Sequence, residues 1–144
     1  MTLRDILHAK GHVVYTIGPD ATLADVVQKL VGHNCGSLIV CDAHFPGQML
    51  GIITERDILK ACAAHRASLA GLKVTDVMTV DVVTGSPSDS VEDTMGLMTR
   101  LRIRHLPVLE DNHLQGLVSI GDVVKMQHDR LTMENHYLKS YLQG

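Results

Sequence analysis

The sequence contains no tryptophan and a single phenylalanine, and aromatic residues make up only 3% of it. Proteins that bind single-stranded nucleic acid stack bases on aromatic side chains, so we expect no such platform. The net charge of -3 also argues against a protein that mainly grips nucleic-acid phosphates. No apolar run approaches the roughly 20 residues that span a bilayer, and no secretory signal is visible. We therefore expect a cytoplasmic protein with neither membrane nor nucleic acid as a partner.

Cysteines are also few, and the three at positions 35, 41 and 62 form no CxxC pair. An odd count without such spacing predicts free thiols, which we expect to be buried or half-buried. The nine histidines show neither the HExxH pattern nor paired Cys/His spacing, so no metal site is predicted. A GxSxG nucleophile elbow is absent as well, and we predict no catalytic residues.

The chain does contain an internal repeat. The segment GIITERDIL at 51–59 returns as GLVSIGDVV at 116–124. Each copy has an apolar run, a hydroxyl residue, two variable positions, an aspartate and a helical pattern. Two further pairs of segments align in the same order: 3–7 with 74–78, and 16–23 with 84–91. Repetition of this kind predicts two similar structural units.

Periodicity predicts the order β-α-β-β-α in each repeat. In the first repeat Thr22 is a good N-cap, and apolar residues follow it at helical spacing: Leu23, Val26, Val27, Leu30 and Val31. In the second repeat Ser90 caps a weaker stripe that we assign to the core: Val91, Met95 and Met98. Short apolar strands come next, and a second helix closes each repeat, from about Glu55 to His65 and from about Ile120 onward.

The predicted fold class is α/β of the α+β type, with each small sheet covered by helices. A repeat of about 60 residues buries too little surface alone, so we expect the two repeats to pack as a pseudo-twofold pair with a cleft between them. The predicted boundaries are 1–71 for the first unit, 72–130 for the second and 131–144 for a C-terminal helical extension.

The repeated hydroxyl-x-x-Asp pattern has two interpretations. It can be a capping box, in which Thr54 or Ser119 caps a helix and Asp57 or Asp122 completes the box. It can also present a carboxylate to the two hydroxyls of a ribose. The two interpretations are compatible, because the hydroxyl can cap while the aspartate faces a ligand.

These motifs resemble a tandem pair of cystathionine-β-synthase (CBS) domains, a Bateman module, here expected to stand alone. The resemblance rests on three repeated features: the aligned segments 3–7 and 74–78, here called the lead-ins; the Thr-x-x-Pro-x-x-[Thr/Ser] entry; and the Gly-h-h-[Thr/Ser]-x-x-Asp signature. It covers roughly residues 1 to 130. Ile39 departs from the pattern, where the family often has the proline seen at Pro107. The resemblance implies a regulatory module that binds AMP, ADP, ATP, NAD or S-adenosylmethionine in the cleft.

Carried over from the family, each site joins the signature of one repeat to residues at or near the starts of strands in the other repeat, here called the strand entries. One predicted site therefore consists of Thr54, Asp57, Thr84, Arg104, His105 and Pro107, with Arg56 as a further phosphate ligand. The other consists of Ser119, Asp122, Thr16, Ala21, Ser37 and Leu38. The first site has more cationic residues, which favours a phosphate tail. The second is expected to prefer a less charged adenosine compound or to stay empty, although Lys10 and His12 are near enough in sequence to supply charge.

The helical pattern continues beyond the second repeat, with Val124, Leu131, Leu138 and Leu142 at nearly sevenfold spacing. An apolar stripe of this kind requires a packing partner, either the module itself or another chain, and we expect a homodimer. The leading hypothesis is an adenine-nucleotide sensor that signals energy status to an unidentified effector protein. The alternatives are a ligand-independent scaffold that binds partners through this helix and a nucleotide-processing enzyme.

Overall fold

The computed structural model describes residues 1–65 and 68–143 of the chain. It is a mixed α+β structure with two small sheets, as predicted from the sequence. The helices are α1 (Leu3–Lys10), α2 (Leu23–His33), α3 (Glu55–His65), the 3-10 turn η1 (Leu69–Gly71), α4 (Val74–Val77), α5 (Val91–Leu101) and α6 (Ile120–Gln143). The strands are β1 (Thr16–Ile17), β2 (Ser37–Val40), β3 (Gly51–Thr54), β4 (His105–Glu110) and β5 (His113–Ser119).

The chain divides into two compact units. A terminal unit contains Met1–His12, Thr84–Glu110 and Gln115–Gly144, and a central unit contains Val13–Val83 and Asp111–Leu114. These units do not coincide with the sequence repeats, because each repeat contributes its lead-in segment to the unit of the other. The repeat boundaries at 1–71, 72–130 and 131–144 stay a prediction about the sequence.

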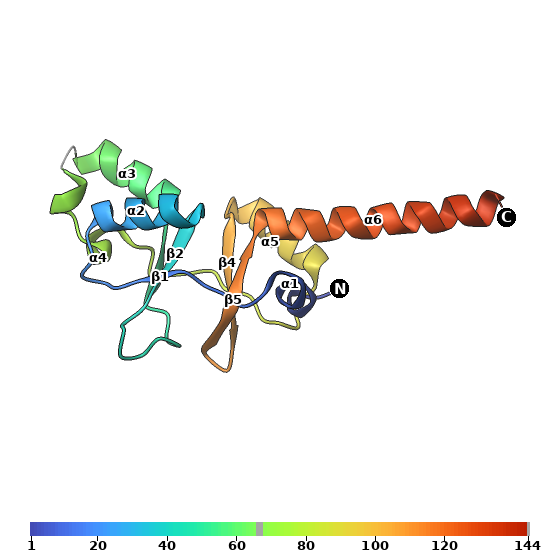
Figure 1. Ribbon diagram of the computed structural model, residues 1–144, viewed down its shortest axis with the longest axis horizontal. Coiled ribbons are helices and arrows are strands. Elements are labelled where there is room, and N and C mark those ends of the chain that lie inside the picture. Colours follow the sequence, from blue (N-terminus) through green and yellow to red (C-terminus); the bar gives the residue numbers. More distant parts are fainter. Residues whose placement is uncertain (66–67, 144) are drawn as a thin grey trace. The chain divides into compact units, whose positions relative to one another are not determined.

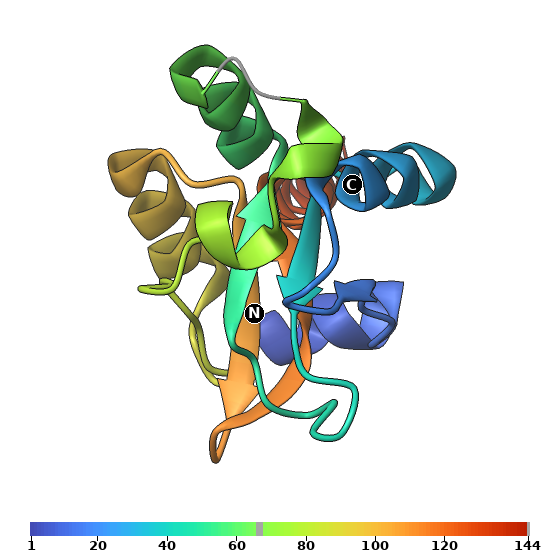
Figure 2. The same ribbon diagram turned by 90° about the vertical axis from the view of Figure 1, so that its left-hand side faces the viewer.

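The central unit is built on a three-stranded sheet in the order β1-β2-β3. β1 pairs with β2 in parallel and β3 pairs with β2 antiparallel, so that Ser37 lies opposite Thr54. Figure 2 shows the connection from β2 to β3 as an extended loop at one end of this sheet. The strands are buried on both faces, and the largest core side chains come from α2 and the sheet: Leu23, Val26, Leu38 and Ile53. Val31, predicted on the apolar stripe of α2, is 76% exposed instead.

The terminal unit contains the two-stranded sheet β4-β5. The prediction of a further strand at the start of the second repeat was wrong, since pairing there is a single parallel bridge between Gly85 and Val108. The ladder ends at once because the N–H of Ser86 donates to the Asp89 carboxylate at 2.8 Å instead of to a strand. Met98 packs in the core as predicted, whereas Met95 is only half-buried.

The lead-in segments are exchanged through backbone hydrogen bonds. At the start of α1, Leu3 donates to the Asp89 carbonyl and Arg4 to the Pro87 carbonyl, both at 3.0 Å. In the central unit, Val74 at the start of α4 donates to the carbonyl of Ala21 at 2.9 Å. Each short helix therefore completes the repeat to which it does not belong in sequence.

Helix α6 follows β5 directly and runs without a break for 24 residues. Figure 1 shows it extending past α1 and α5 to the C-terminus. An ion pair at 3.2 Å joins Arg130 of α6 to Glu92 of α5. None of the helices in the described ranges is long and apolar enough to cross a membrane.

The cysteines differ in their surroundings. All three are free, as predicted, and Cys41 is buried while Cys35 is half-buried. The prediction was wrong for Cys62, which is exposed on α3. Its position follows from helix geometry, because Ile58 and Ala61 form the buried side of α3 and the side chain next to Ala61 turns outward.

Candidate ligand-binding site

The two signature aspartates lie at the strand-to-helix junctions β3–α3 and β5–α6. Asp57 accepts from the backbone N–H of Thr54 at 3.0 Å, and its own N–H donates to Thr54 Oγ1 at 3.3 Å. Asp122 accepts from the N–H of Ser119 at 2.9 Å, and its N–H donates to Ser119 Oγ at 3.1 Å. Both pairs therefore form a complete capping box, and the capping interpretation is confirmed.

The capping box alone does not identify a site in this protein. The same reciprocal bonds, at 3.0 and 3.2 Å, join Thr22 and Asp25 at the start of α2. The carboxylates of Asp57 and Asp122 differ from that of Asp25 because each also receives a hydrogen bond from a distant part of the chain. Both are half-buried, whereas Asp25 is exposed and caps its own helix.

Asp57 receives its additional hydrogen bond from Thr79. The Thr79 hydroxyl lies 3.2 Å from Oδ1 and 3.5 Å from Oδ2 of Asp57. Thr79 is held there by its backbone, which forms a bridge with Ile52 in β3. We did not predict Thr79 from the sequence. The one sequence feature that could have pointed to Thr79 is its position just after the second lead-in. Thr79 reaches Asp57 because that lead-in packs in the unit of the first repeat.

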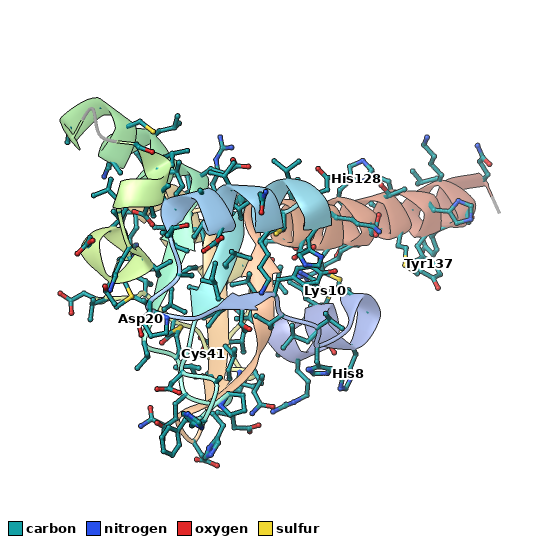
Figure 3. The ribbon with its side chains drawn as sticks, turned by 60° about the vertical axis from the view of Figure 1, so that its left-hand side comes forward. His8, Lys10, Asp20, Cys41, His128 and Tyr137 are labelled. Carbon is teal, nitrogen blue, oxygen red and sulfur yellow. The ribbon has the colours of Figure 1, made fainter. Side chains whose placement is uncertain are left out.

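Asp122 is paired with Lys10, the last residue of α1. Lys10 Nζ lies 2.7 Å from Asp122 Oδ2 and donates to the carbonyl of Leu117 at 2.9 Å. Burial raises the pKa of the Asp122 carboxyl, but the hydrogen bonds from Lys10 and Ser119 and the charge of Lys10 lower it more, so the net pKa is below its ordinary value. Lys10 therefore supplies the positive charge that the second signature lacks. Figure 3 shows Lys10 at the end of α1.

The predicted strand-entry residues of the first repeat gather in the central unit. Thr16 is paired with Ile39 in the register of β1 and β2, and Leu38 is fully buried one residue earlier. Ser37 is only 3% exposed, and its hydroxyl has no hydrogen-bond partner among the described residues. A buried hydroxyl without a partner costs about 1–3 kcal/mol, so it marks a position where a ligand atom would be stabilising.

The strand-entry residues of the second repeat gather in the terminal unit. The N–H of Gly85, next to Thr84, donates to the Pro107 carbonyl at 2.9 Å. Arg104 is exposed, and its carbonyl accepts from the N–H of Ile120 at 2.8 Å. In the first repeat Gly36 and Glu55 form the matching bond at 3.0 Å, which supports the alignment of the repeats. His105 is half-buried at the start of β4.

The structure thus brings each signature together with the strand entries of its own repeat. Grouping each signature with the entries of the other repeat stays a prediction, as does the phosphate contact of Arg56, which is exposed on the first turn of α3. An open groove of about 500 Å³ runs along β1 and α2. Its lining includes one predicted site residue, Ala21, and neither signature aspartate. No group of His, Cys, Asp and Glu side chains suited to a metal ion occurs within the described ranges.

Comparison with known proteins gives consistent matches. A family model described as the CBS domain matches residues 3–64 and again 74–129. A mitochondrial CBS domain-containing protein of Arabidopsis thaliana is 36% identical over 149 residues, covering 99% of this chain and 72% of the relative. A crystal structure of a CBS-domain containing protein from Agrobacterium tumefaciens has a TM-score of 0.83 at 39% identity, covering 88% of this chain and 99% of that one. A CBS domain pair crystallised with methylthioadenosine and S-adenosyl-L-methionine has a TM-score of 0.76 at 26% identity, covering 90% of this chain and 98% of that one.

Proposed function

Because the chain belongs to the CBS domain family and carries two copies of the domain, we propose that it is a regulatory module that senses an adenosine-containing ligand through Asp57 and Asp122. The related domain pair crystallised with two adenosine compounds supports this ligand class. AMP, ADP, ATP and NAD belong to the same class. No catalytic step is assigned to the protein.

One observation carries the proposal. The two signature carboxylates are half-buried, fixed by a capping box and held by a further donor, Thr79 or Lys10. A carboxylate has about four acceptor positions on its two oxygens. The capping box and the additional donor do not use all of these positions on either carboxylate, so each can still accept from a ribose hydroxyl. The hydroxyl of Ser37, which has no partner among the described residues, adds a buried polar group opposite Thr54 of the first signature in the sheet.

A thermal-shift series with AMP, ADP, ATP, NAD and S-adenosylmethionine tests the proposal. At a ligand concentration about 100 times Kd, binding stabilises the native state by about 2.7 kcal/mol. For a chain of this size that corresponds to a rise in Tm of about 5–10 °C. The variants Asp57→Ala and Asp122→Ala should each reduce the rise.

Asp5→Ala is the matched control. Asp5 accepts from the N–H of Thr2 at 2.8 Å in an equivalent capping position on α1, but it lies outside the predicted sites. This variant should lower the starting Tm and leave the ligand-induced rise unchanged. If no adenosine compound raises the Tm of the wild-type protein, the sensor function is wrong.

A specific observation favours a second function, a scaffold that pairs with another copy of the chain through α6. The large apolar side chains in the last half of this helix are mostly exposed: Leu131 59%, Tyr137 67%, Leu138 59%, Tyr141 84% and Leu142 80%. Figure 3 shows Tyr137 projecting from this part of the helix. Val124, Leu131 and Leu138 recur every seven residues, the spacing of a helix that packs against another helix. This function requires no ligand, and the two functions can coexist.

A further inference from the structure

Lys10 gives the Asp122 carboxylate a directly bonded cation, whereas the additional donor at the Asp57 carboxylate is a neutral hydroxyl. Its ammonium group bridges Asp122 Oδ2 at 2.7 Å and the Leu117 carbonyl at 2.9 Å. The segment that follows α1 is fixed next to it, because His12 Nδ1 lies 2.8 Å from the carbonyl of Gln115. The ammonium is therefore held by two elements of the terminal unit and is not a freely moving surface charge.

The equivalent place at Asp57 has no cation among the described residues that bond to it. There the additional donor is the neutral hydroxyl of Thr79, at 3.2 Å from Oδ1. When the two lead-in segments are aligned from Leu3 and Val74, the residue that corresponds to Lys10 is Asp81, an acid. The carboxylate of Asp57 is therefore bonded to neutral donors, whereas that of Asp122 forms an ion pair with Lys10.

The ion pair also leaves bonding capacity on both partners. An ammonium group has three N–H donors, and two of them are used here. Both donors that reach the Asp122 side chain, Lys10 Nζ and the Ser119 N–H, bind Oδ2, and no hydrogen bond to Oδ1 is found within the described part of the chain. A free acceptor on Asp122 therefore lies beside a free cationic donor on Lys10, whose side chain is 36% exposed.

We propose that Lys10 determines the ligand class at the Ser119/Asp122 site, selecting a phosphorylated adenosine compound over the uncharged nucleoside. Oδ1 of Asp122 accepts from the ribose, and the remaining N–H of Lys10 donates to a phosphate oxygen. This rests on the proposed adenosine-sensing function and reverses the sequence-based expectation that the second site takes the less charged ligand. That expectation compared the signature and strand-entry residues of the two sites and named Lys10 only as a possible source of charge. The structure places the Lys10 ammonium on Asp122, 112 positions away in the sequence.

The test compares AMP with adenosine by isothermal titration calorimetry in an Asp57→Ala background, so that heat comes from the Ser119/Asp122 site. Lys10→Met should weaken AMP binding by about ten- to one-hundredfold, as expected for loss of a charge-assisted hydrogen bond, and change adenosine binding by less than about threefold. Lys10→Arg keeps the charge and should retain the preference for AMP. Lys125→Met, an exposed lysine on α6, is the matched control and should behave like the parent.

Two outcomes would overturn the proposal while leaving adenosine sensing intact. In the first, Lys10→Met strengthens the binding of both compounds equally, and Lys10 is then only an internal competitor for Asp122. In the second, Lys10→Met leaves the ratio of the two affinities unchanged, and the ion pair is then only structural. Failure of the proposed function gives a different result, because neither the wild-type protein nor any variant then binds AMP or adenosine.

Discussion

Replacement of the first signature glycine, Gly51, by alanine should destabilise the protein more than the same change at Gly116. A Cβ atom on Gly51 would lie 2.6 Å from the backbone carbonyl oxygen of Thr79 and 3.1 Å from the sulfur of Met78. Carbon–oxygen contacts settle at about 3.3 Å, so the added methyl group is about 0.7 Å too close to the backbone. The carbonyl cannot move away freely, because it accepts from the N–H of Ile52 at 3.0 Å, and Thr79 in turn donates to the Ile52 carbonyl at 2.9 Å.

The expected cost follows from these contacts. Weakening two backbone hydrogen bonds costs about 1 kcal/mol each, and overpacking adds about 1 kcal/mol or more. The smaller unfolded-state entropy of alanine offsets about 0.5–1 kcal/mol of this. Gly51→Ala should therefore lower the free energy of unfolding by about 2–3 kcal/mol, which corresponds to a fall in Tm of about 5–10 °C.

Gly116→Ala is the comparison that isolates the cause. There the added Cβ would lie 2.6 Å from Leu7 Cδ2, a methyl group at the end of a flexible side chain. Leu7 can adjust its rotamer although it is only 1% exposed, so we expect a loss of about 1 kcal/mol. Gly96→Ala is the control, because Gly96 lies within α5 with no atom near the new Cβ, and alanine there should stabilise the helix by about 0.5–1 kcal/mol.

Urea unfolding followed by far-ultraviolet circular dichroism measures all three changes, and this probe suits a protein without tryptophan. If Gly116→Ala costs as much as Gly51→Ala, the difference between a backbone obstacle and a side-chain obstacle does not control the result. An unchanged unfolding midpoint for Gly51→Ala would also refute this explanation.

Two further predictions concern the terminal unit. The Asp122 carboxylate has a lowered pKa in the folded protein, so it contributes stability above the pKa of an unfolded aspartate, about 3.9, and loses that contribution as the pH falls through its lower folded pKa. The stability difference between wild type and Lys10→Met should therefore be present at pH 7 and shrink below about pH 4 in urea titrations; a difference that does not change with pH would contradict this. Leu138→Glu should weaken self-association by about a hundredfold or more in light scattering after gel filtration, since each chain loses a buried leucine worth about 1.5–3 kcal/mol. Ser140→Glu adds the same charge without removing apolar surface, and an equal effect of both changes, or a wild-type monomer, would rule out pairing through α6.

Local patterns in the sequence predicted the local structure well. The helix predicted from about Glu55 to His65 is α3, and the caps at Thr22 and Ser90 begin α2 and α5. These features depend on neighbouring residues, because a capping box and an apolar stripe both operate within one or two turns of a helix. The capping interpretation of the two signatures was correct for the same reason.

Features that depend on distant residues could not be predicted in this way. The contacts of Thr79 with Asp57 and of Lys10 with Asp122 arise because each lead-in helix packs in the unit of the other repeat. Repeat alignment assigns each lead-in to its own copy, so it gives no sign of this exchange. The sequence did name Lys10 as a possible source of charge for the second site, but it did not point to Thr79. The exposure of Val31 was missed for a related reason: an apolar residue at the edge of a stripe is buried only if a neighbouring element covers it.

The exchanged lead-ins impose an order on folding during synthesis. Residues 1–12 leave the ribosome before the first repeat is complete, yet the carbonyls of Pro87 and Asp89, to which they bond, follow only after it. Because synthesis adds about 5–20 residues per second, the apolar face of α1 stays unpacked for several seconds before these segments are made. The capping box between Thr2 and Asp5 joins residues only three positions apart, so the first turn of α1 can be ordered locally during that wait. The terminal unit combines segments of both repeats, so it can be completed only after the second repeat has been synthesised.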